Sequence, residues 1–190
     1  MHTLHSGALY VICMKTILIT ILSAWVSWSN AQCPPEGDNT HSNIIAADLL
    51  KNRQFCPDTS TAVKVSIKEL MKDAVTDSFV MLEAYITSAK ISGKESCECH
   101  LADRQYLDYH IFISDSSDNI AKNLNSIIEV SRYARAINPS LTFDYVKTLV
   151  GHKVKIYGYT FIDEEHKSAI GNWRIGIEEI HPVFFIIQAD

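Results

Sequence analysis

The order of the predicted strands and helices constrains the fold of this chain most strongly. Five segments are predicted to be strands, and in the first, second and fourth of them inward and outward residues alternate with a period of two. The five segments are Ser78 to Ile91, Leu107 to Asp115, Ile127 to Arg132, Lys153 to Ile162 and Asn172 to Ile187. The last of them is expected to be interrupted at Pro182. Thr142 is expected to cap one short helix that runs to about Val150, between the third and fourth strands.

Five strands with one helix between the third and fourth are typical of the OB-fold, a small, partly open Greek-key barrel. A β-sandwich would need about seven short strands. We therefore predict a mostly β chain in which residues 61–190 form a five-stranded OB-like barrel. With 190 residues, the chain is long enough for one such domain with a core of its own.

The segment that precedes the barrel is rich in Pro, Asn, Thr and Asp. Residues 32–60 are therefore expected to form an irregular arm with at most one short helix. The barrel domain is expected to begin with a short extended stretch, followed by a helical turn over Ile67 to Asp73.

Residues 1–31 have the pattern of a secretory signal peptide. Lys15 precedes an apolar run from Thr16 to Val26, and the small residues Ser29 and Ala31 follow. We predict cleavage after Ala31, with Met14 as a possible true start. A retained membrane anchor is the alternative, but the run is shorter than the roughly 20 apolar residues of a spanning helix. The mature chain is therefore expected in the periplasm or outside the cell, without a membrane span.

Charge narrows the class of partner. The chain carries a formal net charge of −5, and loss of Lys15 with the signal would make it −6. A negative domain has no general attraction for phosphate backbones, so nonspecific nucleic-acid binding is disfavoured. A small molecule, a saccharide or a peptide is the expected partner.

Four cysteines remain after the predicted cleavage, namely Cys33, Cys56, Cys97 and Cys99. An even count in an exported chain favours disulfides over metal binding or catalysis. A bridge between Cys97 and Cys99 would be strained, so one or both are expected to reach back to Cys33 or Cys56.

Aromatic and basic residues interleave on the predicted fourth strand, as on a stacking surface with an electrostatic groove. Together with neighbouring strands, this predicts a ligand-binding face. Its expected residues are Tyr109, His110, Tyr157, Tyr159 and His181. The alternative is that the tyrosines cover the edge of the core while the lysines face water.

The histidines raise the alternative of a metal site. His110, Asp163, His166 and His181 could hold a divalent metal such as zinc if they converge. Their spacing matches no zinc motif, and the simplest expectation is that there is no cofactor. His181 could instead satisfy buried backbone groups in a purely structural domain.

Arg174 suggests phosphodiester hydrolysis, in which a carboxylate acts as base and a guanidinium clamps the phosphate. Glu178 and Glu179 face opposite sides of a regular strand, and parity places Glu178 with Arg174. Ordinary cross-strand charge pairing is the alternative. No Gly-x-Ser-x-Gly turn and no glycine-rich phosphate loop occurs in the sequence.

Several short strings of this sequence occur together in one group of proteins. The strings are Asn52-Arg53, Glu95-Ser96-Cys97-Glu98-Cys99, Asp108-Tyr109-His110, Asp163-Glu164-Glu165-His166 and Glu178-Glu179-Ile180-His181-Pro182-Val183. The stretch from Asn52 to Phe185 resembles exported bacterial proteins of uncharacterised function with an OB-like strand order. This resemblance implies a fold and a compartment, and it carries over no catalytic residue.

The leading hypothesis is thus an exported, non-catalytic domain that binds a small or polymeric ligand on an OB-barrel face. The alternative is a metal-assisted hydrolase, with phosphodiesters as the candidate substrate, that uses the histidines and Asp163. These two hypotheses differ in whether His110, His166 and His181 meet at one site.

Overall fold

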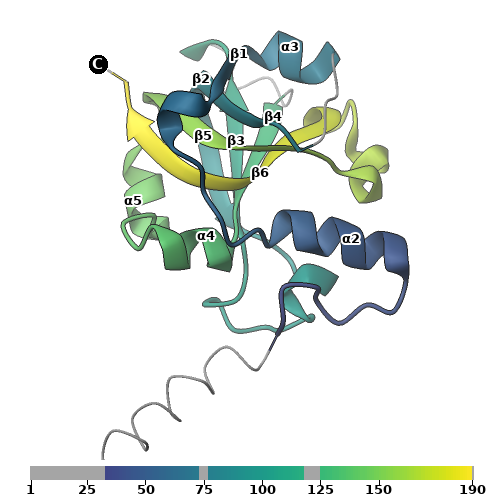
Figure 1. Ribbon diagram of the computed structural model, residues 1–190. Helices are drawn as coiled ribbons and strands as arrows, with labels where there is room; N and C mark the ends of the chain where they lie inside the picture. Colours follow the sequence, from purple (N-terminus) through teal and green to yellow (C-terminus); the bar gives the residue numbers. More distant parts are fainter. Residues whose placement is uncertain (1–32, 73–76, 118–124, 190) are drawn as a thin grey trace, which may run out of the picture. The chain divides into compact units, whose positions relative to one another are not determined.

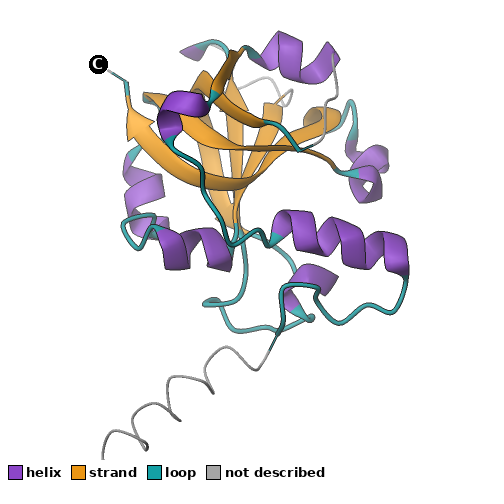
Figure 2. Cartoon of the chain, in the orientation of Figure 1, coloured by secondary structure: helices purple, strands orange, loops and turns teal. Residues whose placement is uncertain are grey.

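The part of the chain described by a computed structural model, residues 33–72, 77–117 and 125–189, is built around one six-stranded sheet. The strands are β1 (Val63–Val65), β2 (Phe79–Ile91), β3 (Tyr109–Ser114), β4 (Asn125–Val130), β5 (Lys153–Ile162) and β6 (Arg174–Gln188). They pair in the order β1-β2-β3-β4-β6-β5, and β5 also pairs with β2. This additional pairing closes the sheet, so the strands curl around one centre (Figures 1 and 2).

The closed ring has the strand order of an OB barrel. Without β1, the ring runs β2-β3-β4-β6-β5 and then returns to β2. In chain order these are the first, second, third, fifth and fourth barrel strands. The third and fifth barrel strands, β4 and β6, run parallel, whereas the other pairs of the ring are antiparallel. The chain is therefore a mostly β, OB-like barrel, as the strand pattern predicts. The sixth strand, β1, is an addition that pairs in parallel with β2 where only an extended stretch was expected.

The fifth barrel strand differs from the prediction, because β6 continues through Pro182 to Gln188. Its pairing with β5 jumps from Gly158 opposite Val183 to Thr160 opposite Ile180. Two residues of β6 therefore stand opposite one residue of β5, and Pro182 lies in this irregularity. A proline is tolerated in an interior strand at such a bulge, because no ladder hydrogen bond is required of it there.

Two short helices, α4 (Arg132–Ile137) and α5 (Phe143–Thr148), occupy the place where one helix was predicted. The hydroxyl of Thr142 accepts a hydrogen bond from the Tyr145 amide, which confirms the predicted cap of α5. Ser131 caps α4 in the same way, through the amide of Ala134. The sequence pattern missed α4 because it extended the third strand to Arg132.

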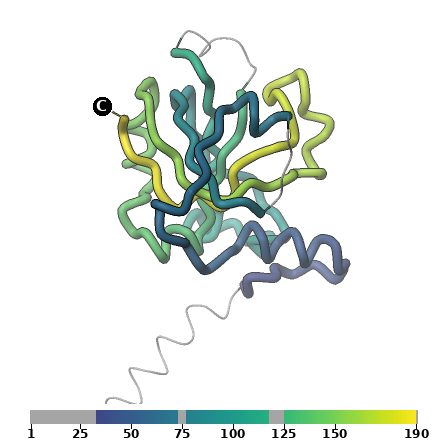
Figure 3. Tube along the Cα trace, turned by 45° about the horizontal axis from the view of Figure 1, so that its top comes forward, coloured from purple at the N-terminus to yellow at the C-terminus, as the bar shows by residue number. Residues whose placement is uncertain are grey.

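The other helical segments lie outside the closed ring of strands. They are α2 (Ser42–Lys51), α3 (Ile67–Lys72) and three 3-10 turns, η1 (Thr59–Thr61), η2 (Ser96–Glu98) and η4 (Glu164–Ala169). The turn predicted over Ile67 to Asp73 is thus confirmed as α3, whereas the arm contains the ten-residue helix α2. Helix α2 packs beside η2 and β6, at one end of the barrel in both views of the chain (Figures 1 and 3). None of the helices in the described ranges is long and apolar enough to cross a membrane.

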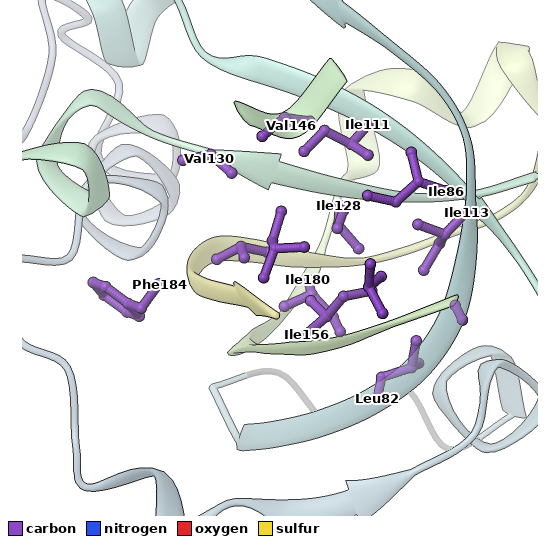
Figure 4. Close-up of a cluster of buried hydrophobic side chains, with 14 of the residues drawn as sticks. Leu82, Ile86, Ile111, Ile113, Ile128, Val130, Val146, Ile156, Ile180 and Phe184 are labelled. Atoms are coloured by element: carbon purple, nitrogen blue, oxygen red, sulfur yellow. The ribbon is translucent and has the colours of Figure 1, made fainter. Parts of the chain in front are cut away.

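The barrel interior is filled by aliphatic side chains from all five ring strands (Figure 4). Along β2, every second side chain points inward, as the alternation in the sequence predicts. The inward residues of β2 are Val80, Leu82, Ala84 and Ile86. Val146 of α5 adds to the same core, so this helix closes over the barrel. The predicted signal peptide lies outside the described residues.

The cysteines form fewer disulfides than expected. Cys33 and Cys99 are disulfide-bonded, whereas Cys56 and Cys97 keep their thiols. The expectation that all four cysteines form bridges is therefore wrong for Cys56 and Cys97. An even count does not force complete pairing, because a buried thiol packs as a small apolar group. Cys97 is buried, and its thiol donates a hydrogen bond to Oε2 of Glu95 at 3.7 Å.

Candidate functional site

Eight ionisable residues form a connected cluster between β3, β4, β6 and η4, which we call the ionic network. Its members are Asp108, His110, Glu129, Asp163, His166, Arg174, Glu179 and His181. All except His166 are at most 5% exposed. Charged groups are seldom buried to this extent unless they are paired or bind an ion. The ionic network is therefore the strongest candidate for a site in the described part of the chain.

Arg174 lies at the centre of the ionic network, and each of its three side-chain nitrogens donates to an acceptor of the protein. Its Nη1 atom donates to Oδ2 of Asp163 at 2.7 Å, and Nη2 donates to Oε2 of Glu179 at 3.1 Å. Its Nε atom donates to the carbonyl oxygen of Gly176 at 2.7 Å. The guanidinium is fully buried and thus joins two carboxylates of the protein.

The carboxylate that partners Arg174 is Glu179, so the predicted pairing with Glu178 is wrong. The even spacing from Arg174 to Glu178 does not place their side chains together, because β6 is irregular here. Its pairing with β4 moves from Arg174 opposite Asn125 to Glu179 opposite Ile127. Five residues along β6 thus span two residues along β4, and the alternation of faces is lost. Glu178 is half-buried and lies outside the ionic network.

His181 is fully buried among three carboxylates. Its Nε2 atom lies 3.1 Å from Oδ2 of Asp108, and its Nδ1 atom lies 3.3 Å from Oε1 of Glu179. Oε2 of Glu129 is 3.9 Å from Nδ1. Burial lowers the pKa of His181, but the hydrogen bonds to Asp108 and Glu179 outweigh it and hold the pKa well above its ordinary value.

Asp108, Glu129 and His181 come close enough together to share one small ion. One ligand atom from each of these three residues lies within 4.8 Å of the other two. We call these three residues the triad. Burial, followed by the neighbouring Glu179, raises the pKa of Glu129 well above its ordinary value. Burial and the nearby Glu179 carboxylate therefore favour the protonated, neutral form of Glu129 when no cation is close to it.

The four residues predicted for a metal site all belong to the ionic network, but only His181 belongs to the triad. His110 reaches the triad through Glu129, whose Oε1 lies 3.3 Å from its Nδ1 atom. Asp163 and His166 are joined to each other at 2.6 Å and connect to Glu179 through Arg174. The three histidines therefore belong to one connected cluster, but they do not converge on one point, because each has a different carboxylate as its nearest partner.

Glu129 was missed by the sequence reasoning, although a usable signal exists. It stands in the run Ile127-Ile128-Glu129-Val130, and a charged residue within so apolar a strand is unusual unless it has a buried role. All six residues of β4 are buried. The same reasoning noted Asp108 only as a neighbour of His110.

The segment between β2 and β3 covers the triad from one side. Oε1 of Glu98 accepts a hydrogen bond from the backbone amide of Asp108 at 2.5 Å, which ties η2 to the start of β3. Burial, followed by the charge of Asp108, raises the pKa of Glu98 to about 8. Lys51 of α2 pairs with Glu95 at 2.9 Å, and the side-chain amide of Asn52 donates to the carbonyl of Cys97 at 2.7 Å. Helix α2 and η2 thus fix each other above the ionic network.

The ionic network also borders a pocket of about 490 Å³ between α2 and the end of β5. Lys51 and Asp163 line this pocket together with Asp48, Glu164 and Glu165. Through Asp163, one edge of the ionic network therefore reaches a recess that opens to solvent.

The five residues expected to form a ligand-binding face do not share one surface. Tyr109 packs on Phe143 with ring centroids 5.2 Å apart, and Tyr157 packs on Phe185 at 6.3 Å. Tyr159 is 8% exposed and lies beneath the guanidinium of Arg53. His110 and His181 are buried in the ionic network. The two tyrosines of β5 are also distant from Tyr109 in the sheet, because β5 pairs with β2 and β6 and not with β3.

A different set of aromatic residues gathers at the surface beside His110. Phe112 of β3 and Trp173, which precedes β6, are both half-buried, with ring centroids 5.9 Å apart. The ammonium of the exposed Lys90 lies 5.4 Å from the Phe112 ring and 5.3 Å from the Trp173 ring. The ring of His166 lies 6.1 Å from that of Trp173. We call Lys90, Phe112, His166 and Trp173 the aromatic patch.

No protein-family model matches this chain, and no curated protein sequence matches it. Among solved structures, an aspartyl-tRNA synthetase from Entamoeba histolytica is 14% identical over 70% of this chain, with a TM-score of 0.40. A protein described as an aspartyl-tRNA synthetase of Leishmania major Friedlin is 10% identical over 72% of this chain, with a TM-score of 0.41. This chain spans 23% of the length of each. Because both TM-scores lie below 0.5, the OB assignment rests on the strand order alone, and the resemblance to exported bacterial proteins stays a prediction.

Proposed function

We propose that the protein is an exported, non-catalytic binding domain that holds an uncharged oligosaccharide on the aromatic patch. The observation that supports this most is the pair of half-buried rings, Phe112 and Trp173, which meet at 70° beside Lys90. Exposed aromatic faces offer flat apolar surface on which the apolar side of a sugar ring packs.

The place of the aromatic patch in the barrel supports the same function. OB-folds bind oligonucleotides and oligosaccharides on their second and third strands and on the loops between strands 1 and 2 and between strands 4 and 5. Phe112 lies on the second barrel strand, β3. His166 lies in the connection between the fourth and fifth barrel strands, and Trp173 lies at its end.

Charge favours a saccharide over a nucleic acid as the ligand. The chain has a formal net charge of −5, and the ionic network adjoining the aromatic patch contains more carboxylates than fixed cations. Phosphate backbones are bound through clusters of lysine and arginine. Lys90 is the exposed cation over the rings of Phe112 and Trp173. Arg174 lies 5.8 Å from the Trp173 ring, but it is buried and paired with protein carboxylates. The surface therefore suits an uncharged ligand with hydroxyl groups.

Export is supported by two independent features. The sequence has the pattern of a cleaved signal ending at Ala31. Cys33 and Cys99 are disulfide-bonded, and such bonds persist in oxidising compartments. The periplasm or the cell exterior is therefore the compartment that we propose.

The alternative of a hydrolase that uses Arg174 gains no support from the geometry. The guanidinium is 0% exposed, and its Nε, Nη1 and Nη2 atoms all donate to oxygens of the protein. A clamp on a phosphate needs donors that are directed at the substrate. Arg174 instead joins η4 to β6 through Asp163 and Glu179, beneath the surface of the protein.

The test is isothermal titration of the purified protein with chitotetraose, cellotetraose and soluble peptidoglycan fragments, with an oligothymidylate as the polyanion. We expect at least one saccharide to bind and Phe112→Ala to weaken it at least tenfold, because stacking on one ring contributes about 1–3 kcal/mol. Tyr157→Ala is the matched control, since it removes another half-buried aromatic ring far from the aromatic patch. Binding of the oligothymidylate alone, or equal losses in both variants, would contradict the proposal.

A further inference from the structure

We infer that Asp108, Glu129 and His181 form a binding site for a divalent transition-metal ion. This site is buried on the outer face of β3, β4 and β6, because Glu129 points away from the core residues Ile128 and Val130. It is separate from the sugar-binding surface proposed above. It also differs from the set of residues that the sequence suggested, because it takes two of its three ligands from carboxylates that were not expected to bind metal.

The geometry of the triad suits an ion. Its three ligand atoms lie within 4.8 Å of one another. Metal–ligand bonds of about 2.1 Å place neighbouring ligand atoms roughly 3–4 Å apart, so small side-chain movements would complete the coordination. Three protein ligands leave at least one position for water, as in many zinc centres.

The ligand types indicate the class of metal. Imidazole suits zinc, copper, iron and nickel, whereas carboxylate also suits manganese, calcium and magnesium. A site with one imidazole and two carboxylates therefore favours Zn²⁺, Mn²⁺ or Fe²⁺ over Ca²⁺.

The residues around His181 are arranged like the outer shell of a metal centre. A histidine that binds a metal usually donates its other ring N–H to a carboxylate, which fixes the orientation of the ring. Nδ1 of His181 lies 3.3 Å from Glu179, and Glu179 is itself held by Arg174 at 3.1 Å. This leaves Nε2, 3.1 Å from Oδ2 of Asp108, as the nitrogen that would bind the ion. Glu129, which is closest to Nδ1 at 3.9 Å, would have to move toward Nε2.

An unsatisfied oxygen at the triad points to a missing partner. Oδ1 of Asp108 is buried and has no hydrogen-bond partner among the described residues. Leaving a buried carboxylate oxygen unpaired is costly, and such groups in folded proteins usually contact water or an ion. A cation between Asp108 and Glu129 would satisfy this oxygen and reduce the repulsion between the two carboxylates.

The competing explanation is that hydrogen bonds and ion pairs alone hold the buried triad together. In that case His181 carries two ring protons and donates one to Asp108 and one to Glu179, and no metal is required. The two explanations differ in a direct observable, because a metal ion that displaces the proton on Nε2 binds with a defined stoichiometry and releases protons.

The test uses tag-free protein that has been treated with chelator, dialysed and titrated with Zn²⁺ and, separately, with Mn²⁺. We expect one ion per chain and a melting temperature that rises with metal concentration, since a ligand that binds only the folded state stabilises it. Asp108→Asn and Glu129→Gln keep the side-chain shapes but remove charge, and each is expected to weaken binding at least 100-fold. Glu178→Gln is the matched control, because it neutralises a nearby carboxylate outside the triad and should bind as the wild type does.

A second measurement keeps the inference falsifiable if the variants fail to fold. Bound Mn²⁺ is paramagnetic, so in the wild-type protein it should broaden the NMR signals of residues near the triad, including His110 and Ile180, and leave those of α5 sharp. Binding by either triad variant at wild-type affinity would overturn the inference. So would the absence of binding at 100-fold excess metal, or broadening confined to the surface.

Discussion

His166 is the most exposed member of the ionic network, and its partner Asp163 makes it sensitive to pH. The hydrogen bond from Nδ1 to Asp163, at 2.6 Å, is the main reason why the pKa of His166 lies above its ordinary value. A group with a raised pKa in the folded state contributes stability that is fully present below its unfolded pKa of about 6.5. This contribution is lost as the pH rises through the folded pKa.

We therefore expect the stability difference between the wild type and His166→Gln to be largest at pH 5.5 and smaller at pH 8.5. Urea unfolding at a series of pH values measures it, and NMR titration of the imidazole gives the pKa directly. His152→Gln serves as the control, because this exposed histidine has no carboxylate partner among the contacts of the described residues. A difference that grows with pH would contradict the role assigned to Asp163.

Arg174 holds two buried carboxylates together, so its loss should be severe. Replacement by Met keeps much of the apolar volume but leaves Asp163 and Glu179 without their shared cation. Breaking a buried ion pair by removing one partner costs about 3–5 kcal/mol of unfolding free energy. Lys167→Met, which removes an exposed ion pair with Glu164, should cost less than about 1 kcal/mol. Chemical denaturation of both variants checks this, and equal losses would show that Arg174 has no special role.

At the scale of elements, the caps of the two short helices between β4 and β5 set their boundaries. Thr142→Ala removes the oxygen that accepts from the Tyr145 amide, and we expect a loss of about 1 kcal/mol in unfolding free energy. Thr148→Ala is the matched control, because Thr148 is exposed at the end of the same helix and caps no amide. Thermal unfolding of the two variants measures the difference. A loss from Thr148→Ala as large as that from Thr142→Ala would contradict the capping role.

The elements of the barrel were largely predictable, because local alternation and turn residues define them. The span of β5 was predicted without error, and the inward face of β2 follows from its alternation. Arg174 and Glu178 mark where this reasoning fails. Arg174 pairs with Glu179 and not with Glu178 because the register between β6 and β4 shifts. A register shift belongs to a pair of strands, so the sequence of one strand does not reveal it.

The candidate site was predictable only in part, for a related reason. His181, Asp163 and His166 attract attention as ionisable residues near strand ends, yet their ligand-like partner Glu129 lies 52 positions from His181 along the chain. Only the parallel pairing of β4 with β6 brings these two residues together. The aromatic patch was missed because Phe112 and Trp173 are ordinary aromatic residues in sequence, and their meeting depends on the pairing of β4 with both β3 and β6.

At the scale of the whole molecule, the two proposals assign metal binding to the buried triad and sugar binding to the aromatic patch at the surface. The ionic network fixes β3, β4 and β6 to one another and, we infer, binds a metal ion at the triad. The aromatic patch lies directly outside it, since the ring of His110 stacks on Phe112 at 5.1 Å and lies 5.6 Å from Trp173. A metal ion at the triad would thus stiffen the strand that presents the sugar-binding rings.

The most direct test of the central claim is the fluorescence of Trp173 during titration with oligosaccharides. The chain has three tryptophans, Trp25, Trp28 and Trp173, and the first two precede the predicted cleavage site. Trp173 is therefore the sole tryptophan of the chain that begins at Gln32. We predict a saturable change in its emission with a saccharide, which Phe112→Ala weakens at least tenfold. Emission that stays unchanged while a saccharide binds, or no response to any saccharide at millimolar concentration, would contradict the account.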